Sequence, residues 1–469
     1  METNVELDVF GQLPFLNLYT ALSLIFTVPD EPVWPGVLLV DKLGLGLERL
    51  SKDIPWLGGK VTSKSSEDDT LGTFRIVSWK PVPQLFIQDL RDDASVPSLE
   101  TLRQAKFPCS MIHEDKLAPY TMVQAGLAGS GAEPSPAFAV QASFIKGGVI
   151  ITFVGHHQVM DMAGLGQLIR LVSAACRGEP FKTTDISAAN LDRRNLIPLV
   201  SDPQSPAQNP TSGKRQQETE ERPLPPRTCQ WANISFSSSS LADIKAKATE
   251  TLPKEAETAF ISTDDALTAF IWQCISRARL GPSGGTDAAE RKATMLTRTV
   301  DLRRYFDLPA TYPGMIHSQV YDRSPSLEDV AAEPLGHIAA RTRAAIQPGG
   351  KGAEELVRHA RALATRITHA SSPAERAGIS FFDSGNGSTD VMISSWSSQD
   401  VYSLDFWEET IGLPEAVRRP VFEPPCEGLV YFLPKGRDGE IVVMLCLEEG
   451  DLERLKADEA VRRHGVWIG

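Results

Sequence analysis

Apolar residues recur with two different periods along the chain, so the sequence predicts both strands and helices. Residues 137–144 and 149–154 are short apolar runs, and Lys146-Gly147-Gly148 between them is typical of the turn of a β-hairpin. A second hairpin is expected where residues 429–433 and 440–447 flank a polar, glycine-containing turn.

Helices are expected where apolar residues return every three or four positions. Ser262 followed by Asp265 is the pattern of a capping box, and the apolar residues after it keep helical spacing until Gly281. A further amphipathic helix should follow residues 155–166 and end near Gly178. Strands and helices alternate without a strict strand–helix–strand rhythm, which favours α/β layers built on mixed sheets.

The chain has 469 residues, too many for one ordinary hydrophobic core, so two domains are expected. Residues 201–227 hold six prolines, many polar residues and no aromatic residue. Such a segment buries too little apolar surface to offset the entropy lost on ordering. We therefore predict an N-terminal domain at 1–200, a linker at 201–227 and a C-terminal domain at 228–469.

Charge and cysteine content exclude several classes of protein. The formal net charge is -13, and general nucleic-acid binding requires a basic surface instead. The six cysteines form no C-x-x-C pair, which favours reduced thiols and a cytoplasmic protein. Residues 13–28 are apolar, but acidic residues precede them and they are too short to span a bilayer. We expect a buried first segment, no membrane partner and a monomer.

The segment of 155–166 (GHHQVMDMAGLG) carries the candidate chemistry, because it directly follows a predicted strand. A histidine of near-neutral pKa can remove a proton from a hydroxyl as its oxygen attacks a carbonyl. His156 and His157 are adjacent, so only one of them can face a given pocket. Asp161 could orient the histidine ring or brace the loop. A purely structural pair of histidines is an alternative, and so is a metal site, although no HExxH motif is present.

Signatures of other catalytic mechanisms are absent from the sequence. The run Gly281–Gly285 (GPSGG) has the bare G-x-S-x-G spacing, but it is typical of an ordinary loop and lacks the Lys-Ser/Thr ending of a Walker phosphate loop. This favours direct attack by a substrate over a covalent enzyme intermediate.

Two motifs resemble those of a known family. His157 and Asp161 form an HxxxD pattern, and Asp405-Phe406 with Pro414-Glu415-Ala416-Val417-Arg418-Arg419-Pro420 resembles the second motif of the BAHD acyltransferases. Further short matches run in order from Leu7-Asp8, through Tyr312-Pro313-Gly314, to residues 455–458. Together they are most similar to the fungal trichothecene 3-O-acetyltransferases.

The resemblance implies a fold and a reaction. Two similar α/β domains with mixed β-sheets flanked by helices, as in chloramphenicol acetyltransferase, should enclose an active-site tunnel. Acyl-coenzyme A would enter from one face and an alcohol acceptor from the other, and no metal is required. Residues 201–227 would cross between the domains, and part of 355–400 would pack on the first domain.

The resemblance also assigns roles to residues. His157 would be the general base, midway along the tunnel. Asp161 would face away from the substrate and pair with Arg303, and Asp405 would hold its own loop. The candidates for binding the phosphates of coenzyme A are Arg298, Arg304, Arg418 and Arg419.

The chain departs from the family where Trp407, Glu408 and Glu409 replace glycines after Asp405-Phe406. The function expected is acyl-coenzyme A-dependent O-acylation, with acetyl as the acyl group, of an alcohol of a fungal secondary metabolite. An enzyme of the same fold that uses His157 for a cyclisation or isomerisation is the alternative. A binder of hydrophobic metabolites without enzymatic activity is a third.

Overall fold

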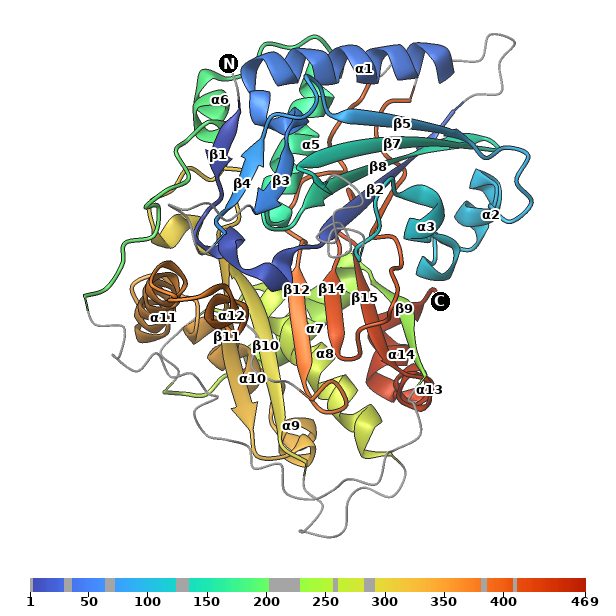
Figure 1. Cartoon of the computed structure of the whole chain (residues 1–469). Coiled ribbons are helices and arrows are strands. Elements are labelled where there is room, and N and C mark those ends of the chain that lie inside the picture. Colours follow the sequence, from blue (N-terminus) through green and yellow to red (C-terminus); the bar gives the residue numbers. More distant parts are fainter. Residues whose placement is uncertain are drawn as a thin grey trace.

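The computed structural model of the chain describes residues 3–28, 36–63, 72–123, 135–201, 228–255, 260–281, 292–380, 386–407 and 411–469. The predicted linker, apart from Ser201, lies outside the described residues, as do Glu408 and Glu409. Figure 1 shows most of the blue-to-green elements of the first half above the lime-green-to-red elements of the second. Each half is built around a mixed sheet with helices packed on it, as the resemblance implied.

The first sheet is centred on the predicted hairpin. Strands β7 (Phe138–Ile145) and β8 (Gly148–His156) pair antiparallel, and Gly147 in the turn has a φ of +79°, which suits glycine. The long apolar strand β2 (Tyr19–Thr27) pairs with β8 along its whole length. The strand order is β13-β2-β8-β7-β5, in which β13 is Ala416–Arg418 and β5 is Gln84–Asp89.

The second sheet contains the other predicted hairpin, formed by β14 (Leu429–Phe432) and β15 (Ile441–Glu448). Its strand order is β11-β10-β12-β14-β15-β9-β16. The remaining strands are β11 (His317–Ser324), β10 (Thr294–Asp301), β12 (Val391–Ser395), β9 (Cys229–Phe236) and β16 (Gly465–Trp467). Parallel pairing of β12 with both neighbours makes this sheet mixed.

The chain crosses back to the first half through β13, which pairs with β2. This strand lies beyond the range 355–400 in which a returning segment was expected. Within that range, α12 (Pro373–Ala377) also contacts the N-terminal half, because Arg376 donates to the carbonyl of Gly72 over 2.8 Å. The two halves are therefore interleaved in space, although their elements are mostly consecutive in sequence.

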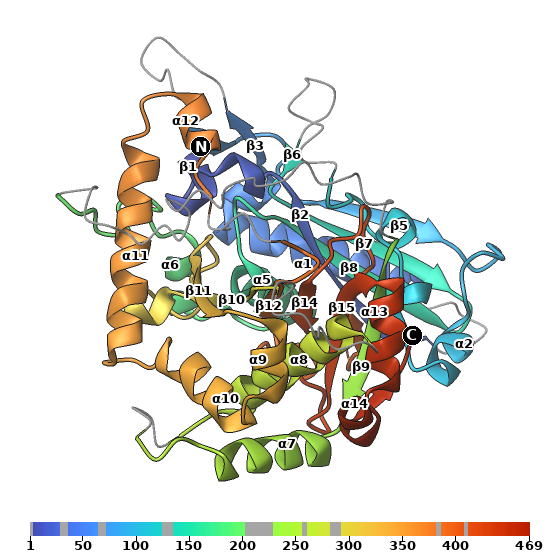
Figure 2. The same cartoon turned by 90° about the horizontal axis from the view of Figure 1, so that it is seen from below.

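Helices cover the sheets as their apolar spacing predicted. On the first sheet, α1 (Gly36–Asp53) packs against α5 (Met162–Cys176). The predicted capping box begins α8 (Thr263–Leu280), and Figure 2 shows α7, α8 and α10 gathered beneath the second sheet. The other helices are α2 (Leu99–Gln104), α3 (Glu114–Leu117), α6 (Thr183–Ala189), α7 (Ser238–Glu250), α9 (Leu327–Ala332), α10 (Leu335–Ala344), α11 (Lys351–Thr368), α13 (Glu449–Ala457) and α14 (Glu459–His464).

Two features of the first half were not expected. A small antiparallel sheet has the order β1-β4-β3-β6, with strands Asn4–Glu6, Phe74–Val77, Lys60–Ser63 and Ser135–Pro136. The N-terminal residues Phe10, Leu13 and Leu16 share one apolar cluster with residues of the second half, such as Leu302 and Leu363. This cluster joins the halves into one body. None of the helices in the described ranges combines the length and apolar character that crossing a membrane requires.

A close backbone contact between the halves lies at the start of α5. A Cβ atom added at Gly164 would lie 2.2 Å from the carbonyl oxygen of Pro313. Gly164→Ala should therefore lower the free energy of unfolding by about 1–3 kcal/mol, because the backbone must shift. Gly44→Ala in α1 is the matched control, since its Cβ would meet nothing within 4 Å and should add about 0.5–1 kcal/mol. Chemical denaturation measures both, and equal effects would contradict the prediction.

Candidate active site

His157 lies immediately after β8, where the first sheet meets the second half. Its backbone N–H donates to the carbonyl of Leu18 over 2.8 Å, which fixes the strand end. Its ring Nδ1 lies 3.1 Å from the carbonyl oxygen of Met160. A carbonyl can only accept, so Nδ1 carries the hydrogen and the lone pair of the neutral ring is on Nε2.

The ring of His157 borders a cavity of about 400 Å³ that both halves line. The apolar part of the wall includes Leu16, Met122, Met392 and Tyr431. The complete lining is Phe15, Leu16, Leu18, Thr20, Met122, His157, Asp161, Met162, Ala163, Thr299, Asp301, His317, Gln319, Met392, Ser394, Ser395, Trp396, Ser398, Gln399, Arg419, Cys426, Leu429 and Tyr431. A hollow that combines apolar side chains with polar groups is typical of a site for a small organic molecule.

The surroundings of His157 keep its ring neutral. Burial lowers the pKa of the imidazole below its ordinary value, and the nearby Arg419 cation lowers it as well. The Met160 carbonyl and the Asp161 carboxylate act in the opposite direction but do not outweigh burial. A neutral imidazole with a free lone pair at a cavity wall can accept a proton.

His156 points to the other side of the strand end and is fully buried. Its Nε2 lies 3.1 Å from Oδ1 of Asn17, and its ring packs edge-on against Tyr19 at 5.2 Å between centroids. Burial and the neighbouring His157 lower its pKa to about 3. The structural interpretation therefore fits His156, while His157 alone of the two lines the cavity.

Asp161 and Arg303 form the expected ion pair, and both are almost completely buried. Arg303 donates from Nη1 and Nη2 to the two carboxylate oxygens of Asp161 over 2.9 and 2.8 Å. Its other N–H groups donate to Asp301 and to the carbonyls of Tyr312 and Gly314, each over 2.8 Å. All five guanidinium hydrogens are therefore used, and the pair ties the start of α5 to the second half.

The role of Asp161 follows from these contacts. Its carboxylate also accepts from the N–H groups of Gly164 over 2.8 Å and Ile316 over 3.0 Å. Burial opposes ionisation, but the charge and hydrogen bonds of Arg303, together with His317 and the N–H of Gly164, outweigh it and hold the pKa of Asp161 below its usual range. Asp161 borders the cavity, yet its oxygens are taken up by these donors, so it braces the loop. The ring of His157 is held by Met160 instead.

A second buried charge cluster at the same interface was not predicted. Arg193 donates from Nη1 to Oδ2 of Asp8 over 2.9 Å, and the N–H of Met315 donates to the same oxygen over 3.0 Å. The hydroxyl of Tyr312 donates to Oδ1 of Asp8. Burial raises the pKa of Asp8 despite the Arg193 charge. Asp8 and Tyr312 had entered the sequence comparison only as parts of short matches, with no role attached.

His317, at the start of β11, is a cavity residue that the sequence did not reveal. Its ring centroid lies 5.6 Å from that of His157, with 39° between the planes. Burial and the neighbouring His157 lower its pKa to about 3, so the ring is neutral near pH 7. Its position shortly after Tyr312-Pro313-Gly314 was the only available signal, and that motif does not say which later side chain faces the cavity.

The four candidate arginines occupy different places. Arg298 is buried and pairs with Asp264 and Asp265. Arg418 donates from Nε to the carbonyl of Phe107 over 2.9 Å and does not line the cavity. Arg304 borders a separate hollow of about 560 Å³ on the second half. Arg419 alone of the four lines the cavity beside His157.

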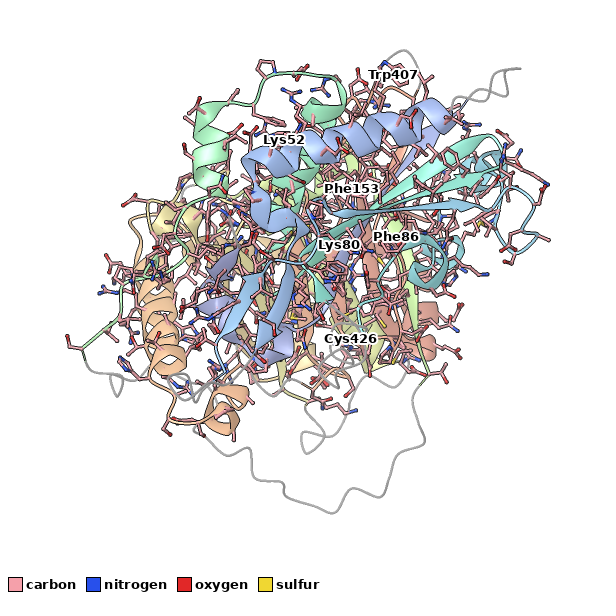
Figure 3. All side chains as sticks on the ribbon, turned by 45° about the horizontal axis from the view of Figure 1, so that its top comes forward. Lys52, Lys80, Phe86, Phe153, Trp407 and Cys426 are labelled. Carbon is pink, nitrogen blue, oxygen red and sulfur yellow. The ribbon has the colours of Figure 1, made fainter. Side chains whose placement is uncertain are left out.

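The Asp405–Trp407 part of the second motif lies away from the cavity. Oδ1 of Asp405 accepts the N–H of Trp407 over 2.7 Å, and the Asp405 carbonyl accepts the Ser173 hydroxyl over 2.7 Å. Nζ of Lys42 on α1 lies 5.0 Å from the centre of the Trp407 ring. Figure 3 shows Trp407 at the top of the view beside α1, and Cys426 of the cavity wall far below it. Asp405 holds its loop, and Trp407 does not line the cavity.

The described part of the chain brings together no group of three or more His, Cys, Asp or Glu side chains suited to a metal ion. The polar groups that line the cavity include two imidazoles, several hydroxyls and the guanidinium of Arg419.

Two family models match the chain. Residues 18–176 match the trichothecene 3-O-acetyltransferase-like N-terminal domain, and residues 115–461 match the Transferase family. Among curated proteins, the O-acetyltransferase dmxR13 of Cryptosporiopsis sp. (strain 8999) is 39% identical over 99% of this chain and 98% of its own.

Solved structures are similar over the whole length. TRI101 of F. sporotrichioides, complexed with coenzyme A and T-2, is 37% identical with a TM-score of 0.86, covering 99% of this chain and 100% of its own. TRI101 of F. graminearum, complexed with coenzyme A and deoxynivalenol, is 35% identical with a TM-score of 0.86 and the same coverage. The chain therefore belongs to the Transferase family of BAHD-type acyltransferases, with a trichothecene 3-O-acetyltransferase-like N-terminal domain.

Proposed function

We propose that this acyltransferase moves an acetyl group from acetyl-coenzyme A to a hydroxyl of a fungal secondary metabolite, with His157 as general base. The observation that carries the proposal is the Nε2 lone pair of a neutral His157 at the wall of a cavity between the two halves. The relatives that bind coenzyme A or are named O-acetyltransferases support the donor and the acyl group.

The geometry suits a direct transfer. The acceptor hydroxyl attacks the thioester carbonyl carbon while Nε2 of His157 takes its proton. The tetrahedral oxyanion then collapses, the carbon–sulfur bond breaks, and the imidazolium returns the proton to the leaving thiolate. The Met160 carbonyl accepts the Nδ1 hydrogen throughout, so Nε2 serves both proton transfers.

Two acceptors bound by the TRI101 relatives provide the first test. The chain is incubated with acetyl-coenzyme A and either deoxynivalenol or T-2 toxin, and products are followed by mass spectrometry and release of free thiol. We expect addition of one acetyl group to an accepted alcohol, and slow hydrolysis of acetyl-coenzyme A when no acceptor is present. Absence of transfer, of hydrolysis and of coenzyme A binding would contradict the proposal.

As the pH is lowered, kcat/KM should begin to fall only below the ordinary pKa of histidine, about 6.5. Protonated His157 cannot act as a base, and burial lowers its pKa, so the neutral ring persists to lower pH than in a free histidine. A profile of kcat/KM between about pH 5 and 8 measures this limb. A limb centred above pH 7 would show that another group controls the rate.

A further inference from the structure

A second hollow adjoins the cavity beside His157. It has a volume of about 490 Å³, and its walls come mainly from β11 and α11. Figures 1 and 2 both show these two elements side by side. Among the described residues, Gln319 alone belongs to the lining of both the cavity and the second hollow.

The two hollows follow one another along one face of β11. Alternate residues of a strand point to the same face. His317 and Gln319 line the cavity, whereas Gln319, Tyr321 and Arg323 line the second hollow. The boundary between the hollows therefore lies at Gln319.

The side chain of Gln319 occupies this boundary without strong hydrogen bonds. Only 3% of the surface of Gln319 is exposed. Its Nε2 donates to the sulfur of Met392 over 3.8 Å, a weak acceptor, and its Oε1 has no partner among the described residues. The side chain therefore acts mainly by the space it fills, and shortening it breaks no strong interaction of the fold.

The acceptor is the reactant that this wall limits. The ring of His317 lies 5.6 Å from that of His157 between centroids. Gln319 lies two residues further along the strand, which adds about 6.6 Å. An acetyl group held at Nε2 of His157 is too short to span this separation, so contact with Gln319 is left to the body of the acceptor.

Beyond Gln319 the second hollow leads to the surface of the molecule. Val320 and Leu356 give it apolar walls, and the exposed Arg323 and Arg358 lie at its outer side. A chain that passed Gln319 would therefore bury methylene groups and could place an anionic end beside these arginines.

We propose that Gln319 is a specificity-determining residue that closes the cavity along β11 and so excludes acceptors that carry a long chain. The proposal rests on the proposed acyl transfer and adds a limit on the acceptor, which must fit within the cavity of about 400 Å³. Shortening Gln319 joins the cavity to the second hollow and removes this limit.

The test compares two acceptors of the same chemistry and different length, 6-hydroxyhexanoic acid and 12-hydroxydodecanoic acid. Titration calorimetry measures their binding to wild type and to Gln319→Ala. The dissociation constant of the longer acid should fall by about tenfold or more in the variant, because burial of about two further methylene groups is enough for that change. The dissociation constant of the shorter acid should change by less than about threefold.

Two further variants serve as controls. Gln319→Met keeps the length of the side chain without its amide, so it should keep the wild-type preference between the two acids. Met392 contacts Gln319 but lines only the cavity, so Met392→Ala widens the cavity without joining the hollows and should not gain affinity for the longer acid. Melting temperatures show that each variant is folded. Equal affinity of wild type and folded Gln319→Ala for the longer acid, or an equal gain in Met392→Ala, would overturn the proposal.

The binding measurement requires no acyl transfer, which separates this proposal from the proposed function. If the wild type transfers no acetyl group, the proposed function fails while calorimetry still decides the role of Gln319. Where transfer occurs, the ratio of kcat/KM for the longer to the shorter acid should rise by about tenfold in Gln319→Ala. A change confined to KM for acetyl-coenzyme A would overturn the proposal, because the second hollow would then belong to the donor.

Discussion

Replacing His157 with alanine should reduce acyl transfer by about two to four orders of magnitude or more while leaving the fold intact. The side chain lies at a cavity wall, and its ring makes one hydrogen bond, to the Met160 carbonyl. Its removal enlarges an existing hollow instead of creating a void in a packed core. The loss should appear in kcat, because proton removal belongs to the transition state and not to ground-state binding.

The matched control is the neighbouring histidine. His156→Gln keeps a donor for Oδ1 of Asn17 but disturbs a fully buried site, so it should cost about 1–3 kcal/mol of unfolding free energy. It should leave kcat within a few-fold of wild type. His157→Ala should therefore lower the rate and keep the melting temperature, whereas His156→Gln should lower the melting temperature and keep the rate. A His157→Ala enzyme with normal turnover, or equal losses of rate in both variants, would refute the assignment.

The parts of the fold that were predicted correctly are set by short-range patterns. The hairpin of β7 and β8 needs only two apolar runs and a glycine turn, and Gly147 adopts the expected positive φ. The capping box of α8 is likewise complete within four residues, from Ser262 to Asp265. Local backbone chemistry decides such elements, so one stretch of sequence is enough to find them.

The features that were not predicted depend on contacts between residues far apart in the sequence. Strand β13 completes a sheet whose neighbouring strand begins at Tyr19, and nothing near Ala416 marks that partner. Asp8, Arg193 and Tyr312 meet only because the fold brings together segments separated by up to 304 residues. A charged residue in a polar stretch resembles a surface residue until its partner is known, so sequence reasoning could not identify this cluster.

The same distinction between local patterns and long-range contacts applies to the candidate site. The strand end and the adjacent histidines marked the loop, but His157 was preferred over His156 only through the resemblance to the HxxxD motif. The sequence could not separate Arg418 from Arg419. Successive residues of an extended segment point to opposite sides, so one binds backbone carbonyls and the other reaches the cavity. Distinguishing them requires knowing which face of β13 meets the second half.

The Asp161–Arg303 pair connects the loop that carries His157 to the stability of the whole chain. Arg303→Met should lower the free energy of unfolding by about 3–5 kcal/mol, because it leaves a buried carboxylate without its cation. Arg303→Lys should recover only part of the loss, since an ammonium cannot replace five donors in a planar array. Arg194→Met, which breaks an exposed pair with Asp192, should leave the free energy of unfolding almost unchanged.

A double-mutant cycle separates the charge from the packing. Asp161→Asn removes the charge that Arg303→Met would strand, so the double variant should be more stable than the sum of the single losses predicts. Chemical denaturation gives the four free energies, and kcat of the folded variants reports whether His157 still faces the cavity. Strict additivity would mean that Asp161 and Arg303 act independently. The α5 terminus would then be held by the hydrogen bonds of Gly164 and Ile316 and by apolar contacts, not by the ion pair.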